Sequence, residues 1–542
     1  MFSILFQTNI ANNVKVVQSN ETILQVLDNI TDASEENQYV IFLPPRIYYL
    51  EEPLVCKEWV HLICPAPYGA ILKPVFEGSS HLIEFASNTY VHGIYMDAEY
   101  KTLGAQIYKN VHNVILRNCL FQKNADHVAC SVDGGYDILF ENCIARYSHG
   151  DDGFSVEEVW DDELGDYVYG HNVTYINCKS HDHSEASGTQ HGFEVEDGCH
   201  DVTFINCEAW NCAGIGIHTH SGYKGCYNIT LIGGKYSRFE SSIGEPGEYL
   251  TNLKVFGTYI EPYWKKDVKF NVSIDPHLWY CGLRNLKNSD VDMTVNGLSV
   301  EISSCENSVI NLKANNIERV NFSDCSSCFL EISASRWENR PDSVLSSDVQ
   351  EGDTIIYVDS IDGFEIGQRL KLSDSNNSEY VIVKGVDVEN NSLETTSPIS
   401  NSYSVANGAK VEVPYWRILM THGDGSNVVK VYSLNGYANY SDAGSNCKIV
   451  FISSEGVDVR DLLEDFTLYP YSKTKLLFNP QGADRKVVPI TWSNCFYKGF
   501  EVTIKNTGDT YNLIFDPDGL NLTISPGESA RVIYDGEQWR QI

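Results

Sequence analysis

Six short apolar stretches recur along the first half of the chain and share one pattern. Each alternates apolar residues, ends in Asn or Gly, and is followed by a small or apolar residue; they are 90–94, 115–119, 139–143, 175–178, 204–207 and 231–234. From Gly93 through Asn118, Asn142, Asn177 and Asn206 to Gly233, the steps are 25, 24, 35, 29 and 27 residues, and a weaker copy ends 24 residues later at Gly257. A period near 25 residues, lengthened where loops are inserted, predicts a right-handed parallel β-helix.

One coil of such a helix cannot bury its own inward face, so coils stack at about 4.8 Å and build one continuous core. The four Asn residues then lie above one another at a bend, where their amides can hydrogen-bond along the stack. Cys119, Cys143, Cys178 and Cys207 follow them as a column of small apolar side chains. We therefore expect a structural Asn-Cys column rather than a metal or redox site.

The pattern predicts an all-β chain, a right-handed parallel β-helix followed by small β-sandwich or barrel modules. Apolar residues at helical spacing in 22–30 predict a short helix near the start. The expected parts are an N-terminal cap with first rungs (1–80), the parallel β-helix (81–340), a small barrel or sandwich (345–413), a connecting β region (414–470), and a C-terminal sandwich for trimerisation or carbohydrate binding (471–542).

Charge and cysteine content restrict the partners and the compartment. The chain has 542 residues, 39 of them basic and 73 acidic, for a formal net charge of −34. This excess of acid argues against nucleic acid and against an anionic membrane as partner. The first residues show neither a signal peptide nor a membrane span. The 16 cysteines then indicate synthesis in a reducing cytosol with free thiols.

Acids and histidines collect where the strands after each bend are aligned. The alignment places Ala129, Ser155, Glu194 and Gly216 in one outward column, and Ser131, Glu157, Glu196 and His218 in a second. Asp126, Asp152 and His191 come just before these strands. Carboxylates one rung apart lie about 5 Å from each other, so one pKa should rise and supply a general acid beside a general base.

The longest insertions flank these acids. One insertion carries Trp160, Tyr167 and Tyr169, whose rings suit stacking on sugars. Metal-ligating side chains occur at three places, His181–His183, Asp161–Glu163 and the pair Cys325 and Cys328, but we expect no metal or cofactor.

Four segments carry a resemblance to known families. A β-helix followed by β-modules, with the sequence 363–368 and the ending Pro526–Ser529 and Ile533–Trp539, resembles a bacteriophage tailspike or tail fibre. The first rungs, near 40–64, resemble pectate-lyase-like proteins. The resemblance implies a homotrimer made in the host cytoplasm and carried on the virion tail, which binds and often cleaves a bacterial surface polysaccharide during host adsorption. Because the β-helix starts almost at once, attachment to a virion would need an adaptor protein.

A second resemblance concerns the site. Asn124-Ala125-Asp126, Asp151-Asp152-Gly153 and Gln190-His191-Gly192 follow the order of the motifs of inverting polygalacturonases. The resemblance implies that Asp126, Asp151, Asp152 and His191 line one catalytic cleft. The later Arg-Ile-Lys motif of that family has no match here, and Lys235 and Arg238 are only near its place.

We expect a polysaccharide depolymerase that works by acid–base hydrolysis. Asp152 with Asp126 or Asp151 would be acid and base, and His191 would assist. The wider expected site adds Glu157 and Glu196 as catalytic residues, and Trp160, Tyr167, Tyr169, Glu194, His218, His220 and Tyr223 as substrate contacts. Three alternatives stay open: a polysaccharide lyase with His191, His218, His220 or Tyr223 as base, a receptor-binding fibre without enzymatic activity, and a free polysaccharide-degrading enzyme.

Overall fold

The computed structural model describes most of the chain in two compact units. One consists of Met1–Cys305 with Glu338–Tyr415, and the other of Glu306–Trp337 with Trp416–Ile542. The described residues are 13–183, 191–221, 224–243, 250–260, 280–296, 299–315, 319–335, 342–364, 369–413, 417–423, 427–433, 439–442, 448–453, 457–462, 466–468, 475–480, 483–489, 501–516, 520–534 and 538–542. No helix among them is long and apolar enough to cross a membrane.

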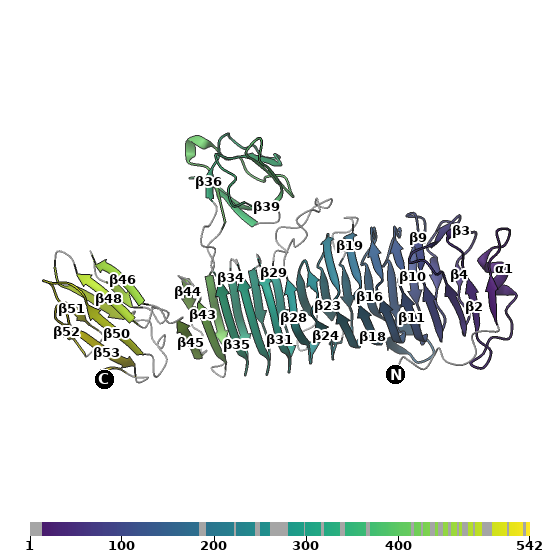
Figure 1. The fold of residues 1–542 in the computed structure, drawn as a ribbon, viewed down its shortest axis with the longest axis horizontal. Coiled ribbons are helices and arrows are strands. Elements are labelled where there is room, and N and C mark those ends of the chain that lie inside the picture. Colours follow the sequence, from purple (N-terminus) through teal and green to yellow (C-terminus); the bar gives the residue numbers. More distant parts are fainter. Residues whose placement is uncertain are drawn as a thin grey trace. The chain divides into compact units, whose positions relative to one another are not determined.

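The first unit contains a parallel β-helix with three faces (Figure 1). The first face contains β1 (Val14–Val16), β2 (Tyr39–Phe42), β5 (Val60–Ile63), β8 (Thr89–His92), β11 (His112–Arg117), β14 (Tyr136–Glu141), β18 (His171–Ile176), β21 (His200–Ile205), β24 (Thr230–Ile232), β28 (Lys254–Ile260) and β31 (Asp290–Asn296). The second contains β3 (Arg46–Leu50), β6 (Ala70–Pro74), β9 (Ile94–Asp97), β12 (Leu120–Gln122), β15 (Ile144–Arg146), β19 (Lys179–His183), β22 (Glu208–Cys212) and β25 (Lys235–Tyr236).

The third face carries the residues that matter below. It contains β4 (Leu54–Val55), β7 (His81–Glu84), β10 (Leu103–Ile107), β13 (Cys130–Asp133), β16 (Phe154–Asp161), β20 (Phe193–Val195), β23 (Ile217–Ser221), β26 (Phe239–Ile243), β29 (Tyr280–Arg284) and β32 (Ser299–Ser303). Two short strands, β27 (Leu250–Thr251) and β30 (Leu286–Lys287), pair with each other. The predicted helix is α1 (Ile23–Asp28), which Thr22 and Gln25 close with a capping box.

The interior of the β-helix is filled by aromatic and aliphatic side chains that repeat from coil to coil. Phe154 stacks on Phe193 at 5.4 Å between ring centroids and meets Phe121, Phe140 and Tyr175 edge-on at 5.6–5.8 Å. All five side chains are fully buried. These ring contacts pack the third face against the other two, so the backbone that carries the outward side chains next to Phe154 is held rigidly.

The Asn-Cys column forms at the predicted bend. Asn118, Asn142, Asn177 and Asn206 all adopt the left-handed conformation, with φ between 51° and 54°. Asn177 Nδ2 donates to Asn142 Oδ1 at 3.3 Å. The four cysteines that follow them are fully buried, and every cysteine in the described part of the chain is a free thiol. The cysteines of the column therefore belong to the buried interior, next to the bend that the sequence predicted.

We expect Asn142→Ala to destabilise the β-helix by about 1–2 kcal/mol. The substitution removes the amide contact and places a Cβ-bearing residue that lacks a polar side chain at positive φ. Asn142→Gly keeps the backbone conformation without strain, so its cost should be smaller. Urea denaturation of both variants checks this order, and an equal cost for Ala and Gly would show that backbone strain plays no part.

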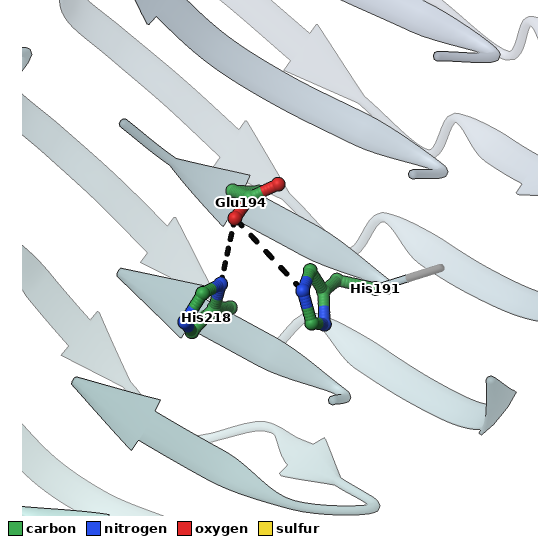
Figure 2. A group of neighbouring side chains, drawn as sticks. All are labelled: His191, Glu194 and His218. Atoms are coloured by element: carbon green, nitrogen blue, oxygen red, sulfur yellow. Dashed lines mark hydrogen bonds and ion pairs between the residues drawn. The ribbon is translucent and has the colours of Figure 1, made fainter. Parts of the chain in front are cut away.

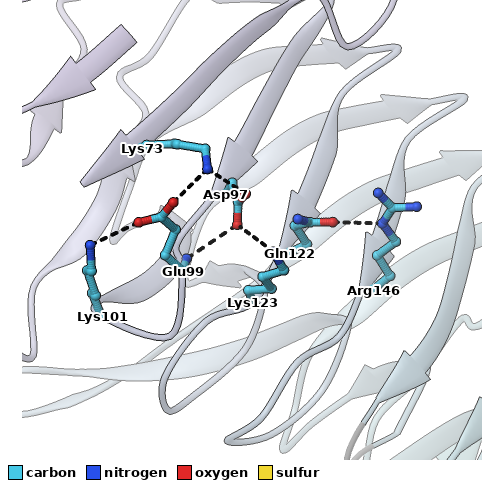
Figure 3. Close-up of polar contacts among 7 residues, drawn as sticks. All are labelled: Lys73, Asp97, Glu99, Lys101, Gln122, Lys123 and Arg146. Atoms are coloured by element: carbon cyan, nitrogen blue, oxygen red, sulfur yellow. Dashed lines mark hydrogen bonds and ion pairs between the residues drawn. The ribbon is translucent and has the colours of Figure 1, made fainter. Parts of the chain in front are cut away.

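A network of charges lies on the second face (Figure 3). Glu99 binds Lys73 at 2.6 Å and Lys101 at 2.9 Å, and the buried Asp97 lies 3.5 Å from Lys73 and 3.7 Å from Lys123. The hydrogen bonds from the two lysines lower the pKa of Glu99 to about 2. This network links β6 and β9 to the loops that follow β9 and β12.

Glu99 should make the stability of the β-helix depend on pH at the acid end. Because its pKa is depressed on folding, its contribution is complete above the ordinary value of 4.5 and is lost as the pH falls towards 2. Solvent screening limits the effect to about 1 kcal/mol. Glu99→Gln should lack this part of the pH dependence when urea denaturation is compared at the two ends of the range. Parallel curves for wild type and variant would contradict the assignment.

A small antiparallel module follows the β-helix in sequence within the first unit. It consists of β36 (Asp342–Val344), β37 (Ile355–Tyr357), β38 (Arg369–Ser373), β39 (Ser378–Asp387), β40 (Ser392–Thr395), the 3₁₀ turn η3 (Val405–Asn407) and β41 (Lys410–Glu412). Its strands are ordered β36-β41-β38-β39-β40-β37 around a core of its own that includes Leu370, Leu393 and Val411.

The second unit returns to parallel coils. Strand β34 (Arg319–Cys325) pairs in parallel with β42 (Arg417–Gly423), and β35 (Phe329–Ser335) pairs with β43 (Val428–Ser433). The remaining coil strands are β33 (Val309–Asn315), β44 (Asn439–Asp442) and β45 (Lys448–Ser453). The antiparallel module is therefore inserted between successive rungs, and much of the expected connecting region supplies rungs itself.

The C-terminal part of the second unit has two sheets. One contains β46 (Val457–Leu462), β48 (Lys475–Pro480), β50 (Glu501–Asn506), β53 (Ser529–Tyr534) and β54 (Trp539–Gln541); the other contains β47 (Phe466–Leu468), β49 (Arg485–Pro489), β51 (Leu513–Phe515) and β52 (Leu522–Ile524). They share a core that includes Phe478, Phe515 and Trp539.

Candidate functional site

The outward side chains of the third face form two polar rows. The register pairs Ser131 with Ser155, Ser155 with Glu194, Glu194 with His218, and His218 with Glu240. In the second row Asp133 pairs with Glu157. The predicted pairing of Ser155 on β16 with Glu194 on β20 is therefore right. The strands on either side are shifted by two residues from the predicted alignment, so Glu194 pairs with His218 rather than with Gly216. A shift of two preserves the inward and outward pattern, which is why the sequence did not reveal it.

Asp152 and His191 meet at the turns that precede these strands. Asp152 is 1% exposed, and its Oδ1 accepts a hydrogen bond from the main-chain N–H of His191 at 2.6 Å. Its second oxygen is buried without a hydrogen-bond partner in the described part of the chain. Burial, and then the neighbouring Glu194, raises the pKa of Asp152 well above its usual value. Asp152 thus connects the turn before β16 with the turn before β20 through a hydrogen bond.

The imidazole of His191 is held in one tautomer. Its Nδ1 accepts a hydrogen bond from the main-chain N–H of Ile215 at 2.8 Å. Burial and the neighbouring ring of His218 lower the pKa of His191 well below its usual value, so the ring is neutral at neutral pH. A neutral ring whose Nδ1 is an acceptor carries its proton on Nε2. Nε2 lies 4.0 Å from Oε1 of Glu194.

Glu194 stands between two imidazoles (Figure 2). Its Oε1 lies 2.6 Å from Nδ1 of His218, and the rings of His191 and His218 are 4.3 Å apart. Burial raises the pKa of Glu194 well above its usual value and lowers the pKa of His218 to about 4. Burial therefore favours the protonated form of Glu194 and the neutral form of His218.

Two further acids continue the cluster. Burial, and then Asp133, raises the pKa of Glu157 well above its usual value. Burial and Glu157 raise the pKa of Glu196 to about 9. Since Val156 and Val195 are paired, Glu157 and Glu196 follow on neighbouring strands. Each carboxyl group raises the pKa of its neighbours because the coils superpose, as the sequence predicted.

Asp151 is the partly exposed member of the cluster, and the exposed Asp126 lies outside it. A carboxylate oxygen of Asp151 lies within 4.8 Å of oxygens of Asp152 and Glu194. Asp151 is partly exposed, and burial raises its pKa. Asp126 is exposed, and its Oδ1 accepts a hydrogen bond from the N–H of His127 at 2.9 Å. The structure therefore brings Asp151, Asp152, His191 and Glu194 together and leaves Asp126 outside this group.

An antiparallel hairpin continues from the strand that carries Glu157. Strand β16 pairs with β17 (Asp166–Tyr169), which places Trp160 opposite Tyr167 with ring centroids 5.1 Å apart. These side chains are 48% and 37% exposed. Tyr169 is instead covered by Lys224, whose Nζ lies 4.0 Å from the ring centroid. The hairpin offers two exposed aromatic rings.

The remaining expected contacts have mixed positions. His220 is partly exposed and stacks on His218 at 5.7 Å, whereas Tyr223 lies outside the described residues. Arg238 is 2% exposed and donates to the carbonyls of Cys212 and Ala213, so its guanidinium is buried in the scaffold. Sequence reasoning passed over Asp133 and His127, which lie beside Glu157.

Two of the stretches weighed as metal sites are occupied by internal contacts. His183 is fully buried, its Nδ1 accepting from the N–H of Ser148 and its Nε2 lying 2.8 Å from Ser180 Oγ. Asp161 binds Lys109 at 2.8 Å and accepts from the N–H groups of Glu163 and Leu164. Both residues fix loops at the margin of the third face.

The arrangement supplies the parts of acid–base chemistry. Burial favours the protonated form of Glu194, and the partly exposed Asp151 has a carboxyl oxygen within 4.8 Å of an oxygen of Glu194. The imidazoles of His191 and His218 lie next to Glu194, and their lowered pKa values keep them neutral at neutral pH.

A family model described as a right-handed beta helix region matches residues 75–233. No curated protein matches the chain. The match agrees with the parallel strand pairing of the first unit, and the fold is thus a right-handed parallel β-helix with separate β-modules.

Several solved structures are similar to this chain at low identity. The A-module of mannuronan C-5 epimerase AlgE4 of Azotobacter vinelandii is 12% identical, with a TM-score of 0.35 over 79% of this chain and 93% of that one. The pre-mature gene product 12 of bacteriophage phi29 is 14% identical, with a TM-score of 0.37 over 93% and 71%. The tailspike protein gp49 of Acinetobacter baumannii bacteriophage Fri1, a capsular polysaccharide depolymerase, is 13% identical, with a TM-score of 0.35 over 74% and 86%.

Proposed function

We propose that this protein is a glycoside hydrolase that depolymerises a bacterial surface polysaccharide, with Glu194 as general acid and Asp151 as nucleophile. The observation that carries the proposal is the buried Glu194 carboxyl group, held at 2.6 Å from a neutral His218 and within 4.8 Å of the more exposed Asp151. A protonated acid next to an ionisable carboxylate is the pair that glycoside hydrolysis requires.

The spacing of the two acids favours retention of configuration at the anomeric carbon. Retaining glycosidases hold their carboxyl groups about 5–5.5 Å apart, whereas inverting ones leave about 6.5–9.5 Å for a water molecule. One oxygen of Asp151 lies within 4.8 Å of an oxygen of Glu194, which is nearer to the retaining spacing than to the inverting one. This differs from the inverting chemistry of the polygalacturonases that the sequence resembles.

The steps follow from these positions. Glu194 donates its proton to the glycosidic oxygen while Asp151 attacks the anomeric carbon, so the leaving sugar departs as an alcohol and an ester forms. Glu194, now ionised, takes a proton from water, which attacks the anomeric carbon and frees Asp151. Asp152 acts as a positioning residue, because it binds the main chain of His191 rather than facing solvent.

The hairpin supports a sugar as substrate. Trp160 and Tyr167 present exposed rings on an extension of the strand that holds Glu157. Aromatic faces of this kind pack against the apolar faces of sugar rings, so a chain extending along the third face would meet both the hairpin and the acids.

Incubation with a panel of bacterial capsular and envelope polysaccharides tests the proposal. Mass spectrometry of the products should show the addition of water at each cleaved bond, and proton NMR at early times should show the anomeric configuration of the substrate. Products that carry a double bond would establish a lyase instead. Binding to a polysaccharide without any cleavage would establish a receptor-binding protein.

We further propose that the enzyme works as a homotrimer on a phage tail. The support is the sequence resemblance of the C-terminal segments to tailspikes. Sedimentation equilibrium of the full chain should give three times the monomer mass of 60.9 kDa. A monomer would favour the free enzyme.

A further inference from the structure

A second cluster of ionisable side chains lies at the N-terminal end of the polar rows. It consists of His127, which lies in the turn before β13, Asp133 at the end of β13, and Glu157 on β16. One ring nitrogen and one oxygen of each carboxylate all lie within 4.8 Å of one another. The cluster shares no residue with the acid and nucleophile assigned above.

Asp133 presents one oxygen to this cluster. It is 5% exposed, and its Oδ2 accepts hydrogen bonds from Gln106 and Ser131. Its Oδ1 is buried and has no hydrogen-bond partner in the described part of the chain. A buried carboxylate oxygen without a partner is costly, so a ligand that occupies it is favoured.

The neighbouring side chains are fixed in the same way. Ser155 Oγ donates to Oε1 of Glu157, which orients this carboxylate from behind. Asp133 and Glu157 are partners in the parallel register, so the strands hold their Cα atoms one rung apart. Hydrogen bonds from outer side chains that orient carboxylates in this manner are typical of metal sites.

The imidazole of His127 completes the set. No hydrogen bond within the described residues engages its ring, and the ring of His81 is 6.0 Å away. His127 has a φ of 60° in the turn, so it is placed by the backbone conformation rather than by contacts of its side chain. Its ring nitrogens remain available to a ligand.

We propose that His127, Asp133 and Glu157 bind a divalent transition-metal cation, Zn²⁺ in particular. One imidazole and two carboxylates suit a borderline cation, whereas Ca²⁺ and Mg²⁺ prefer oxygen ligands alone. Ligands at Zn²⁺ lie about 3.3 Å apart in a tetrahedral site, so the three side chains close by at most about 1.5 Å. Three protein ligands leave a fourth position open to water or to an oxygen of the substrate.

The alternative trio of His191, Glu194 and His218 also gathers within 4.8 Å, but its hydrogen bonds oppose a metal. His191 Nδ1 accepts from Ile215, so Nε2, the atom that faces Glu194, carries the ring proton. A histidine that ligates a metal through Nε2 donates a hydrogen bond from Nδ1, whereas Nδ1 of His191 accepts one. We therefore place the cation at His127, Asp133 and Glu157 rather than at the trio around Glu194.

Isothermal titration of the full chain with Zn²⁺, after treatment with EDTA, tests this inference. One ion should bind per chain, and Co²⁺ should give the visible absorption of a low-coordinate site. Glu157→Gln keeps the contact with Ser155, and His127→Asn suits the left-handed backbone. Each should weaken Zn²⁺ binding by at least 10-fold, whereas His149→Asn, on an exposed turn of the same coil, should not.

The proposal is overturned if the wild type fails to bind Zn²⁺, or if the two variants bind as tightly as it does. Circular dichroism shows whether each variant retains its fold, and a variant that loses it is replaced by Asp133→Asn. The readout is binding alone, so a failure here leaves the proposed hydrolysis intact, and a failure of hydrolysis leaves the cation site intact.

Discussion

Glu194→Gln should reduce polysaccharide cleavage by about 10²–10⁴-fold. Glutamine has the same shape and can still hydrogen-bond to His218, but it has no proton to give to a leaving sugar. The effect should appear in kcat more than in KM, because the lost interaction belongs to the transition state. The measurement is the release of reducing ends from a polysaccharide that the wild type cleaves.

Two companion variants make this result specific. Asp151→Asn should lose activity on the same scale, because it removes the nucleophile. Glu163→Gln removes an exposed carboxylate at the tip of the hairpin and should leave activity unchanged. Full activity in Glu194→Gln, with normal folding, would remove Glu194 from the chemistry.

Phe154→Ala should destabilise the β-helix by about 3–5 kcal/mol. The ring is fully buried and contacts the rings of Phe121, Phe140, Tyr175 and Phe193, so truncation leaves a cavity that its stacked neighbours cannot fill. Because Phe154 follows Asp152 and Gly153 directly, the same change should also disturb the site. Urea denaturation followed by far-UV circular dichroism measures the loss.

Phe154→Leu is the matched control. Leucine keeps most of the buried volume, so its cost should be about 1–2 kcal/mol. A loss below about 1 kcal/mol in Phe154→Ala would mean that the ring does not pack between coils as described.

The sequence predicted the fold well because its signal is repeated. Each Asn or Gly at a bend marks the end of one strand, and the period between bends gives the coil. The C-terminal end of the parallel coils was harder to predict from the sequence. The antiparallel module between Asp342 and Glu412 interrupts the coils in the sequence, and they resume at β42, which pairs with β34. Nothing in a local pattern shows that a strand pairs with another almost a hundred residues away.

The site was predicted in part for a related reason. The order of Asp151, Asp152, Glu157, His191 and Glu194 along the chain was enough to place them on one face. The contact between Glu194 and His218 depends on the register of β20 and β23, and a two-residue shift leaves the apolar alternation unchanged. The roles of Asp152 and Arg238 depend on burial, which the motif resemblance does not encode.

The proposed chemistry requires that carboxyl groups of the cluster hold protons at neutral pH, because the coils bring them together away from water. Infrared difference spectroscopy of the EDTA-treated protein at pH 7 tests this directly. The wild type should show the carbonyl absorption of protonated carboxylic acids, and part of it should be absent in Glu194→Gln but present in Glu163→Gln. A wild-type spectrum with ionised carboxylates alone would contradict the account.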